Sequence, residues 1–130
     1  MKTIIAGSRS IKNLNIVEQA IAASNFDITL VISGGAKGVD SLAEEWAKLN
    51  NIPFQEFLAD WKNLDTPNAI IKANSYGKYN ARAGLDRNEV MAKNGDALIA
   101  IWDGRSTGTQ HMVSMAEEYN LKVFLYNYSV

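Results

Sequence analysis

Residues 29–43 read Thr29-Leu-Val-Ile-Ser-Gly-Gly-Ala-Lys-Gly-Val-Asp-Ser-Leu-Ala43, and this stretch decides the fold. A Val/Ile-rich run leads into glycines and then into an amphipathic helical pattern. A glycine-rich turn between strand and helix lets the backbone approach a phosphate, which the helix N-terminus attracts. A second such stretch is Ala97-Leu-Ile-Ala-Ile-Trp-Asp-Gly-Arg-Ser-Thr-Gly-Thr109. Repetition of this turn in a short chain indicates a nucleotide or a nucleotide-like ligand.

Alternating β and α patterns extend from this stretch in both directions. We predict strands at residues 2–7, 28–33, 53–58, 96–102 and 122–126, with helices near 14–21, 39–50, 83–95 and 108–119. Such alternation is typical of parallel strands joined by helical crossovers. The predicted fold is a single doubly wound Rossmann-like α/β domain spanning residues 1–130. Its mostly parallel five-stranded sheet has the order 3-2-1-4-5, with helices on both faces.

Finer expectations concern the helix ends and the segment that breaks the alternation. We expect Val90 and Met91 to face inward, and Asn120 to end the last helix in a left-handed conformation. Residues 60–82 contain Pro67, Gly77 and four asparagines, and we predict a long loop or lid there. Within it, Ala69-Ile-Ile-Lys-Ala73 is a candidate short helix.

Composition excludes several classes of protein. The chain has 130 residues, no cysteine and one histidine, so disulfides, thiolate metal sites and a histidine-based zinc site are not expected. No apolar run is long enough to span a membrane, and the first one reaches Gly7 too soon for a signal peptide. The net charge of −1 argues against nucleic acid as a partner. We expect a cytoplasmic protein with no cofactor and no metal.

The predicted sheet order places a ligand where the order reverses, between the first and fourth strands. Ligands of open α/β sheets lie beyond the carboxyl ends of the strands at this point. The loops at residues 7–9, 34–40 and 104–109 all fall at those ends. Their convergence is the strongest functional indication that spacing provides.

Each loop residue also has a structural interpretation. Gly34 and Gly35 either admit a ligand or only form a tight turn, and Asp40 either binds a ligand hydroxyl or favours the helix dipole. Arg9, directly after a buried strand, either meets an anion or forms a salt bridge with Asp40 or Asp103.

Similar alternatives apply to the last loop and to the aromatic residues. One hydroxyl of residues 106–109 serves as an ordinary N-cap, whereas three beside a glycine favour phosphate contact. Trp61 and Trp102 stand at strand ends, where a ring stacks a base or packs under the long loop. Trp46 is expected in the core, and His111 on an exposed helix face.

Five motifs occur in order: Gly7-Ser-Arg9, Ser33-Gly-Gly-Ala-Lys-Gly-Val-Asp-Ser-Leu-Ala-Glu-Glu-Trp-Ala47, Ala59-Asp-Trp61, Ala83-Gly-Leu-Asp-Arg-Asn-Glu-Val-Met91 and Asp103-Gly-Arg-Ser-Thr-Gly-Thr-Gln-His-Met112. Together they resemble the YAcAr-like branch of the SLOG superfamily, Rossmann-like domains of bacteria and phages. SLOG relatives include the DNA-processing protein A family, the Lonely Guy phosphoribohydrolases and ligand-sensing domains of antiphage systems. The resemblance implies a pocket for a nucleotide derivative, built from the first, second and fourth strand loops.

The resemblance also separates a binding protein from an enzyme. Lonely Guy hydrolases carry Pro-Gly-Gly-x-Gly-Thr-x-x-Glu with a catalytic Glu, and Met112 occupies that position here. Methionine cannot perform acid–base chemistry, although Asp40, Asp86 or Glu89 could substitute. We therefore favour a binder of a nucleotide-derived small molecule, forming a homo-oligomer, over a hydrolase of an N-glycosidic bond, and assign no catalytic residue. The predicted ligand-binding residues are Gly7, Ser8, Arg9, Ser33, Gly34, Gly35, Lys37, Gly38, Asp40, Arg87, Asn88, Gly104, Ser106, Thr107, Gly108 and Thr109.

Overall fold

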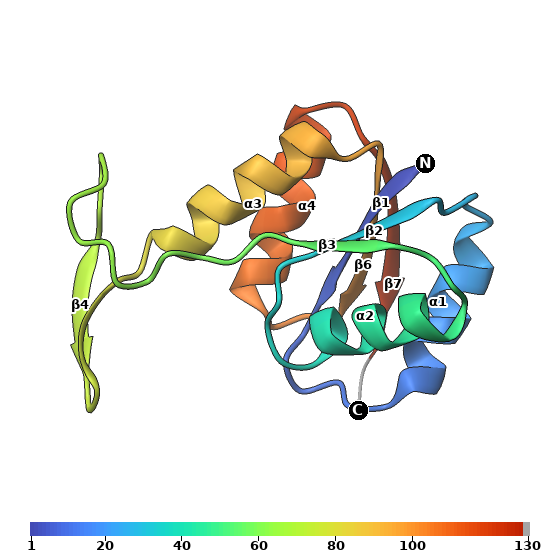
Figure 1. Ribbon diagram of the computed structural model, residues 1–130, viewed down its shortest axis with the longest axis horizontal. Coiled ribbons are helices and arrows are strands. Elements are labelled where there is room, and N and C mark those ends of the chain that lie inside the picture. The colour runs from blue at the N-terminus through green and yellow to red at the C-terminus, as the bar shows by residue number, and fades with distance from the viewer. Residues whose placement is uncertain (129–130) are drawn as a thin grey trace.

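A computed structural model describes residues 1–128 and contains a five-stranded sheet between two layers of helices (Figure 1). The strands of this sheet are β1 (Lys2–Gly7), β2 (Leu30–Ser33), β3 (Phe54–Glu56), β6 (Ala97–Trp102) and β7 (Lys122–Asn127). They lie in the order β3-β2-β1-β6-β7, and every neighbouring pair is parallel. Counted within the sheet, this is the predicted order 3-2-1-4-5. The doubly wound Rossmann-like fold is confirmed.

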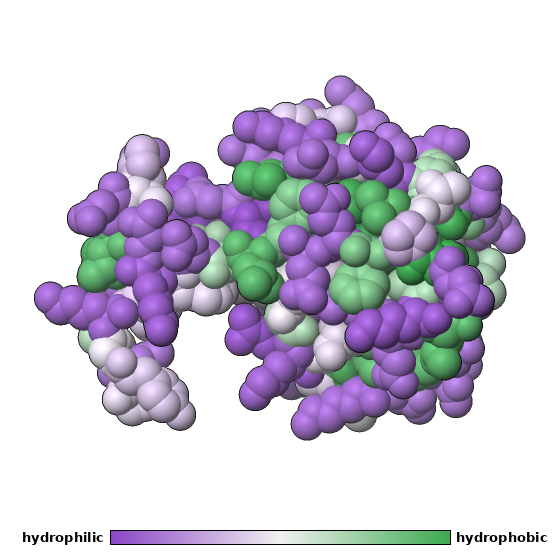
Figure 2. All heavy atoms as spheres, viewed as in Figure 1, coloured by the Kyte–Doolittle hydropathy of each residue, from purple (hydrophilic) through white to green (hydrophobic). Residues whose placement is uncertain are grey.

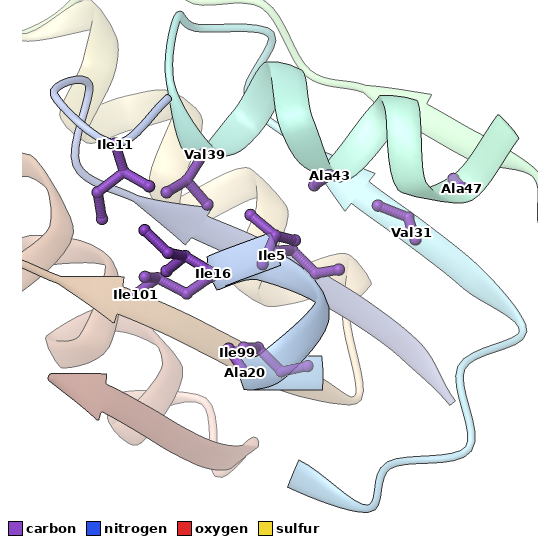
Figure 3. Close-up of a cluster of buried hydrophobic side chains, with 11 residues drawn as sticks. Ile5, Ile11, Ile16, Ala20, Val31, Val39, Ala43, Ala47, Ile99 and Ile101 are labelled. Atoms are coloured by element: carbon purple, nitrogen blue, oxygen red, sulfur yellow. The ribbon is translucent and has the colours of Figure 1, made fainter. Parts of the chain in front are cut away.

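Two apolar clusters hold the helices against opposite faces of the sheet. The helices α1 (Leu14–Ser24) and α2 (Val39–Leu49) pack on one face, and α3 (Ala83–Asn94) and α4 (Thr107–Glu118) on the other. Because side chains alternate along a strand, Ile5 of β1 joins the first cluster and Ile4 joins the second. Figure 3 shows the first cluster, in which Ile5 and Ile99 lie beneath α1 and α2. Full burial of each such side chain contributes roughly 1.5–3 kcal/mol.

The helix ends follow from local chemistry. The Asn13 side chain caps α1 by accepting from the N–H of Asn15 at 2.9 Å. Asn120 adopts the left-handed conformation with φ 61°, which confirms the prediction for the end of α4. On α3, Met91 is buried, but Val90 is 44% exposed, so the prediction that both face inward is wrong for Val90. Adjacent helical residues point about 100° apart, and only one of them meets the sheet.

Residues 60–82, which we call the arm, leave the body of the molecule. Here β4 (Ile71–Asn74) and β5 (Gly77–Asn80) form an antiparallel hairpin beyond the N-terminal end of α3 (Figure 1). The short helix predicted at residues 69–73 is therefore wrong. Asn74 accepts from the N–H of Tyr76 at 2.8 Å and Gly77 has a φ of 116°, so a tight turn closes a hairpin instead. Figure 2 shows a largely hydrophilic arm surface with a small apolar area.

The described helices lie between residues 14 and 118. None of them combines the length and the apolar character that a membrane crossing requires.

Candidate functional site

A cleft of about 650 Å³ lies at the carboxyl ends of β1 and β6, where the strand order reverses. Its walls come from the loops after β1, β2 and β6, from the first turns of α3 and α4, and from the arm. The predicted site residues that line it are Gly7, Ser8, Arg9, Asp40, Arg87, Asn88, Ser106, Thr107, Gly108 and Thr109. That these residues bind a ligand stays a prediction.

The predicted glycines of the β2–α2 loop contact protein side chains and do not line the cleft. A Cβ on Gly34 would collide with the guanidinium of Arg87, whose Nη1 donates to the Gly34 carbonyl at 2.5 Å. Gly35 has a φ of 69°, and a Cβ there would lie 2.5 Å from Leu58 Cδ2. The space that these glycines leave is thus filled by the protein itself.

The other predicted residues outside the cleft lining are Ser33, Lys37, Gly38 and Gly104. The Ser33 hydroxyl donates to the Glu44 carboxylate at 2.8 Å, and burial raises the pKa of Glu44. Gly38 packs against the backbone of the β1 loop, where a Cβ would lie 2.5 Å from the Ser8 carbonyl oxygen. These contacts position the loops that carry the cleft residues.

Arg87 and Asn88 join α3 to the other cleft walls. Arg87 Nε donates to Asn88 Oδ1 at 3.2 Å, and Asn88 Nδ2 donates to the Gly108 carbonyl at 3.3 Å. The same Asn88 amide lies 3.1 Å from Nδ1 of His111, which must accept this hydrogen bond as a neutral ring. Burial, and then the positive charge of Arg82, lowers the pKa of His111, which favours that neutral form. His111 is half-buried, not on the exposed face that the sequence suggested.

The loop before α4 satisfies most of its own polar groups. Asp103 Oδ1 accepts from the N–H groups of Arg105 at 2.8 Å and Ser106 at 3.0 Å, and these bonds lower the pKa of Asp103. Ser106 is the N-cap, and its Oγ accepts from the Thr109 N–H at 3.2 Å and the Thr109 hydroxyl at 2.9 Å. The first helical residues therefore keep only a few donors for a ligand.

Those remaining donors belong to Thr107 and Gly108. Neither backbone N–H has a hydrogen-bond partner within residues 1–128. No atom lies within 4 Å of the position that a Cβ on Gly108 would occupy, so the helix terminus opens to the cleft there. Two free N–H groups at the positive end of a helix dipole attract an anion.

Three arginines line the cleft together with these donors, Arg9 and Arg105 being exposed, against two carboxylates, Asp40 and Asp103. None of the ion pairs within residues 1–128 includes Arg9 or Arg105, so the alternative salt bridge from Arg9 to Asp40 or Asp103 does not form. Asp40 is 7% exposed and accepts from the Ala36 N–H at 3.2 Å. Burial raises the pKa of Asp40, while that bond and the charges of Arg87 and Arg9 oppose the rise. The cleft therefore has a positive excess.

The floor of the cleft is apolar, and Met112 forms part of it. Its side chain is 1% exposed and packs in the second cluster with Ala6 and Met91, both of which also line the cleft. Within residues 1–128, no group of three His, Cys, Asp or Glu side chains is placed to hold a metal ion.

Several cleft residues were not in the predicted set. Arg105 could have been predicted from the sequence, because it lies inside the loop of residues 104–109 that was expected to form part of the site. The small and apolar ones carry no chemical signal of their own. The residues concerned are Ala6, Ser10, Ala36, Trp61, Ala81, Gly84, Leu85, Met91, Asp103, Arg105 and Met112.

Comparisons with known proteins agree with this fold. The sequence profile of the family described as YAcAr, the YspA, cpYpsA-related SLOG family, matches residues 1–64. The Gene 61 protein of Mycobacterium phage D29 is 30% identical over 132 residues, which cover 94% of this chain and 93% of the phage protein. The X-ray structure of DNA processing protein A from Streptococcus pneumoniae matches with a TM-score of 0.69 and 22% identity. That match covers 99% of this chain but about half, 51%, of the other, and it shows the fold alone.

Proposed function

We propose, because this chain belongs to the YspA, cpYpsA-related (YAcAr) SLOG family, that it binds a nucleotide or nucleotide-derived small molecule in the cleft. Binding would serve to sense, carry or sequester that molecule. The volume of about 650 Å³ suits a ligand of this size, since small-molecule sites typically measure roughly 300–1,000 Å³.

One observation carries the proposal: unpaired cations and unpaired backbone donors line the same cleft. Arg9 and Arg105 form no ion pair within residues 1–128, and the N–H groups of Thr107 and Gly108 have no partner there. A phosphate accepts charge-assisted hydrogen bonds from both kinds of donor. The phosphate of the ligand is therefore assigned to the start of α4.

A thermal-shift screen tests this function directly. The probes are nucleoside mono-, di- and triphosphates, cyclic nucleotides, dinucleotides and ADP-ribose, with product analysis of every probe that stabilises the protein. Stabilisation without turnover supports the binding protein. The absence of any shift across the screen contradicts the proposal.

A matched pair of variants locates the phosphate. Arg9→Ala should weaken binding of a stabilising phosphorylated probe by about tenfold or more, because a charge-assisted hydrogen bond contributes roughly 1.5–3 kcal/mol. Lys37→Ala removes the same charge from an exposed residue that does not line the cleft, and it should leave affinity within about threefold. Equal losses in the two variants would indicate long-range charge effects rather than a contact.

A second candidate function is hydrolysis of an N-glycosidic bond, and Asp40 favours it. This carboxyl lines the cleft, is buried, and has a raised pKa, which is the condition of a general acid. It could protonate a leaving base while water adds to the anomeric carbon. Release of free base by the wild type, abolished in Asp40→Asn, would replace the binding function with this one.

We also propose that the arm acts as a lid over the cleft, because Trp61 and Ala81 at its base line the cleft. Amide hydrogen exchange within residues 60–82 should slow when a nucleotide binds. Equal protection with and without nucleotide would rule out a lid.

The predicted homo-oligomer is checked by sedimentation, and the cytoplasmic location by cell fractionation.

A further inference from the structure

Trp61 lines the cleft with part of its indole ring exposed, while other parts of the ring contact the protein. The side chain is 37% exposed and lines the cleft. A Cβ on Gly84 would lie 2.9 Å from Trp61 Cη2, so the ring rests on this glycine at the start of α3. Tyr79 meets the indole edge to face, with ring centroids 6.5 Å apart and an interplanar angle of 70°.

The base of the arm fixes the backbone of Trp61. The Asn80 N–H donates to the Trp61 carbonyl at 2.6 Å, and Asn80 is 1% exposed. The Asn80 side chain makes four further hydrogen bonds, accepting from the N–H groups of Ile70 and Arg82 and donating to the Asn63 carbonyl and the Thr66 hydroxyl. A fully bonded buried amide holds one conformation, so the backbone of Trp61 is tied to the base of the arm.

The three tryptophans differ in what surrounds them. Trp102 does not line the cleft, and its Nε1 donates to the Ser106 carbonyl at 2.9 Å. Trp46 packs against the first apolar cluster. Within residues 1–128, Tyr79 is the only ring against Trp61, and no cation lies over it. The exposed part of the Trp61 ring is therefore available to another planar group.

The surroundings of Trp61 differ in chemistry from the rest of the cleft. The arm and the first turn of α3 also give the cleft Ala81, Gly84 and Leu85, which are small or apolar, and Gly84 contacts the Trp61 ring. The ends of the sheet instead supply charged side chains, namely Arg9, Arg105, Asp40 and Asp103, and the two arginines form no ion pair within residues 1–128. A cleft with an aromatic wall and a separate cationic wall matches a molecule with a planar ring at one end and a phosphate at the other.

We propose that Trp61 stacks on the nucleobase of the ligand, while the phosphate of the same molecule lies at the start of α4. This assignment rests on the proposed function and adds the orientation of the ligand. Stacking tolerates every base, because each base has a π-face, so Trp61 selects for the presence of a base and not for its identity.

The affinities of the wild type and three variants for AMP, GMP, CMP and UMP test the assignment. Trp61→Phe keeps an aromatic face and should retain the wild-type affinity within about threefold. Trp61→Leu keeps an apolar side chain without a ring, and it should bind every nucleotide that the wild type binds about tenfold more weakly or worse. Tyr79→Leu is the matched control, because it removes the edge contact of Trp61 without touching the cleft lining. The affinity of Tyr79→Leu for the nucleotides should fall by less than threefold.

A fluorescence measurement separates contact from packing. In a protein with Trp46→Phe and Trp102→Phe, Trp61 emission should be quenched by the nucleotides and unchanged by ribose 5-phosphate, which lacks a base. Unaltered emission at saturating nucleotide would overturn the assignment, as would equal affinity losses in Trp61→Phe, Trp61→Leu and Tyr79→Leu. If no probe of the thermal-shift screen binds the wild type, the proposed function itself fails. If nucleotides bind and Trp61→Leu is neutral, only the stacking fails.

Discussion

The sheet and the arm are both built from β-strands, but they are stabilised in different ways. Every side chain from Ala97 to Ile101 in β6 is fully buried, and the strand has a parallel partner on each side. All four residues of β4 are exposed. Within residues 1–128, β4 and β5 pair only with each other. An isolated two-stranded hairpin is marginal in water, because it has no covered apolar face.

The difference shows where rigidity in this molecule comes from. Burial of apolar side chains fixes the sheet, whereas one buried asparagine and a few hydrogen bonds, all made within residues 60–82, hold the base of the arm together. The cleft lies between these regions and takes its floor from the first and one wall from the second. We therefore expect the two regions to unfold separately, with local opening of the arm at a lower free energy.

The largest effect is expected from the same substitution made in both regions. Ile99→Ala removes a fully buried side chain and should lower the free energy of unfolding by roughly 2–5 kcal/mol. Ile71→Ala, in the arm, removes a side chain that is 46% exposed. It should change the free energy of unfolding by less than about 1 kcal/mol. Urea denaturation followed by circular dichroism measures both. Similar losses would mean that the arm belongs to the cooperative core.

The cleft floor is tested by Met112→Glu. The side chain is 1% exposed, and a carboxylate there would lack a partner in the cluster, so we expect a loss of about 3 kcal/mol. Met112→Leu conserves volume and polarity and should cost less than about 1.5 kcal/mol. Urea midpoints compare the two variants. Wild-type stability in Met112→Glu would show that water reaches the floor, and such a variant should then be assayed for nucleotide hydrolysis.

Asn80→Ala should loosen the arm and leave the sheet unchanged. It removes the four side-chain hydrogen bonds at the base of the arm and leaves buried groups unsatisfied, at a local cost of about 1–3 kcal/mol. Amide exchange should accelerate in residues 60–82 and stay unchanged in β1 and β6. Asn74→Ala, in the exposed turn of the hairpin, is the control and should affect only its own turn. Acceleration in the sheet as well would contradict independent opening.

The smallest effect is a pH dependence at Asp40. Burial raises the pKa of Asp40 in the folded state above its value in the unfolded chain. The folded state therefore binds this proton more tightly, and the resulting stabilisation is present below the unfolded pKa and lost as pH rises through the folded pKa. Asp40→Asn should gain stability relative to the wild type as pH rises across that window. A stability difference that is constant with pH would show that Asp40 titrates normally.

Most of the fold could be predicted because burial leaves a periodic pattern in the sequence. The sheet strands and the helices appear near their predicted positions, although β2 begins at Leu30, and β3 spans only Phe54–Glu56. The arm lacks such a pattern, since it buries few apolar side chains. Its hairpin depends on turn chemistry at residues 74–77, which an apolar run at residues 69–71 obscured.

The site could be predicted to the level of loops but not of contacts. A glycine shows that space is needed beside the backbone, but the sequence does not show what fills that space. At Gly34 the occupant is the guanidinium of Arg87, more than fifty residues away in the chain. The distinction between Trp61 and Trp102 likewise depends on which ring meets the Ser106 carbonyl, which spacing cannot show.

The central position of β1 has a consequence for synthesis of the chain. Ile4 pairs with Ile32 on one side of β1 and with Leu98 on the other. During translation β2 and β3 emerge soon after β1, whereas its second partner appears only when residues 97–102 leave the ribosome. Closing that long loop is an entropically costly and slow step. Until then the nascent chain exposes an apolar strand edge, so a product truncated before β6 should aggregate.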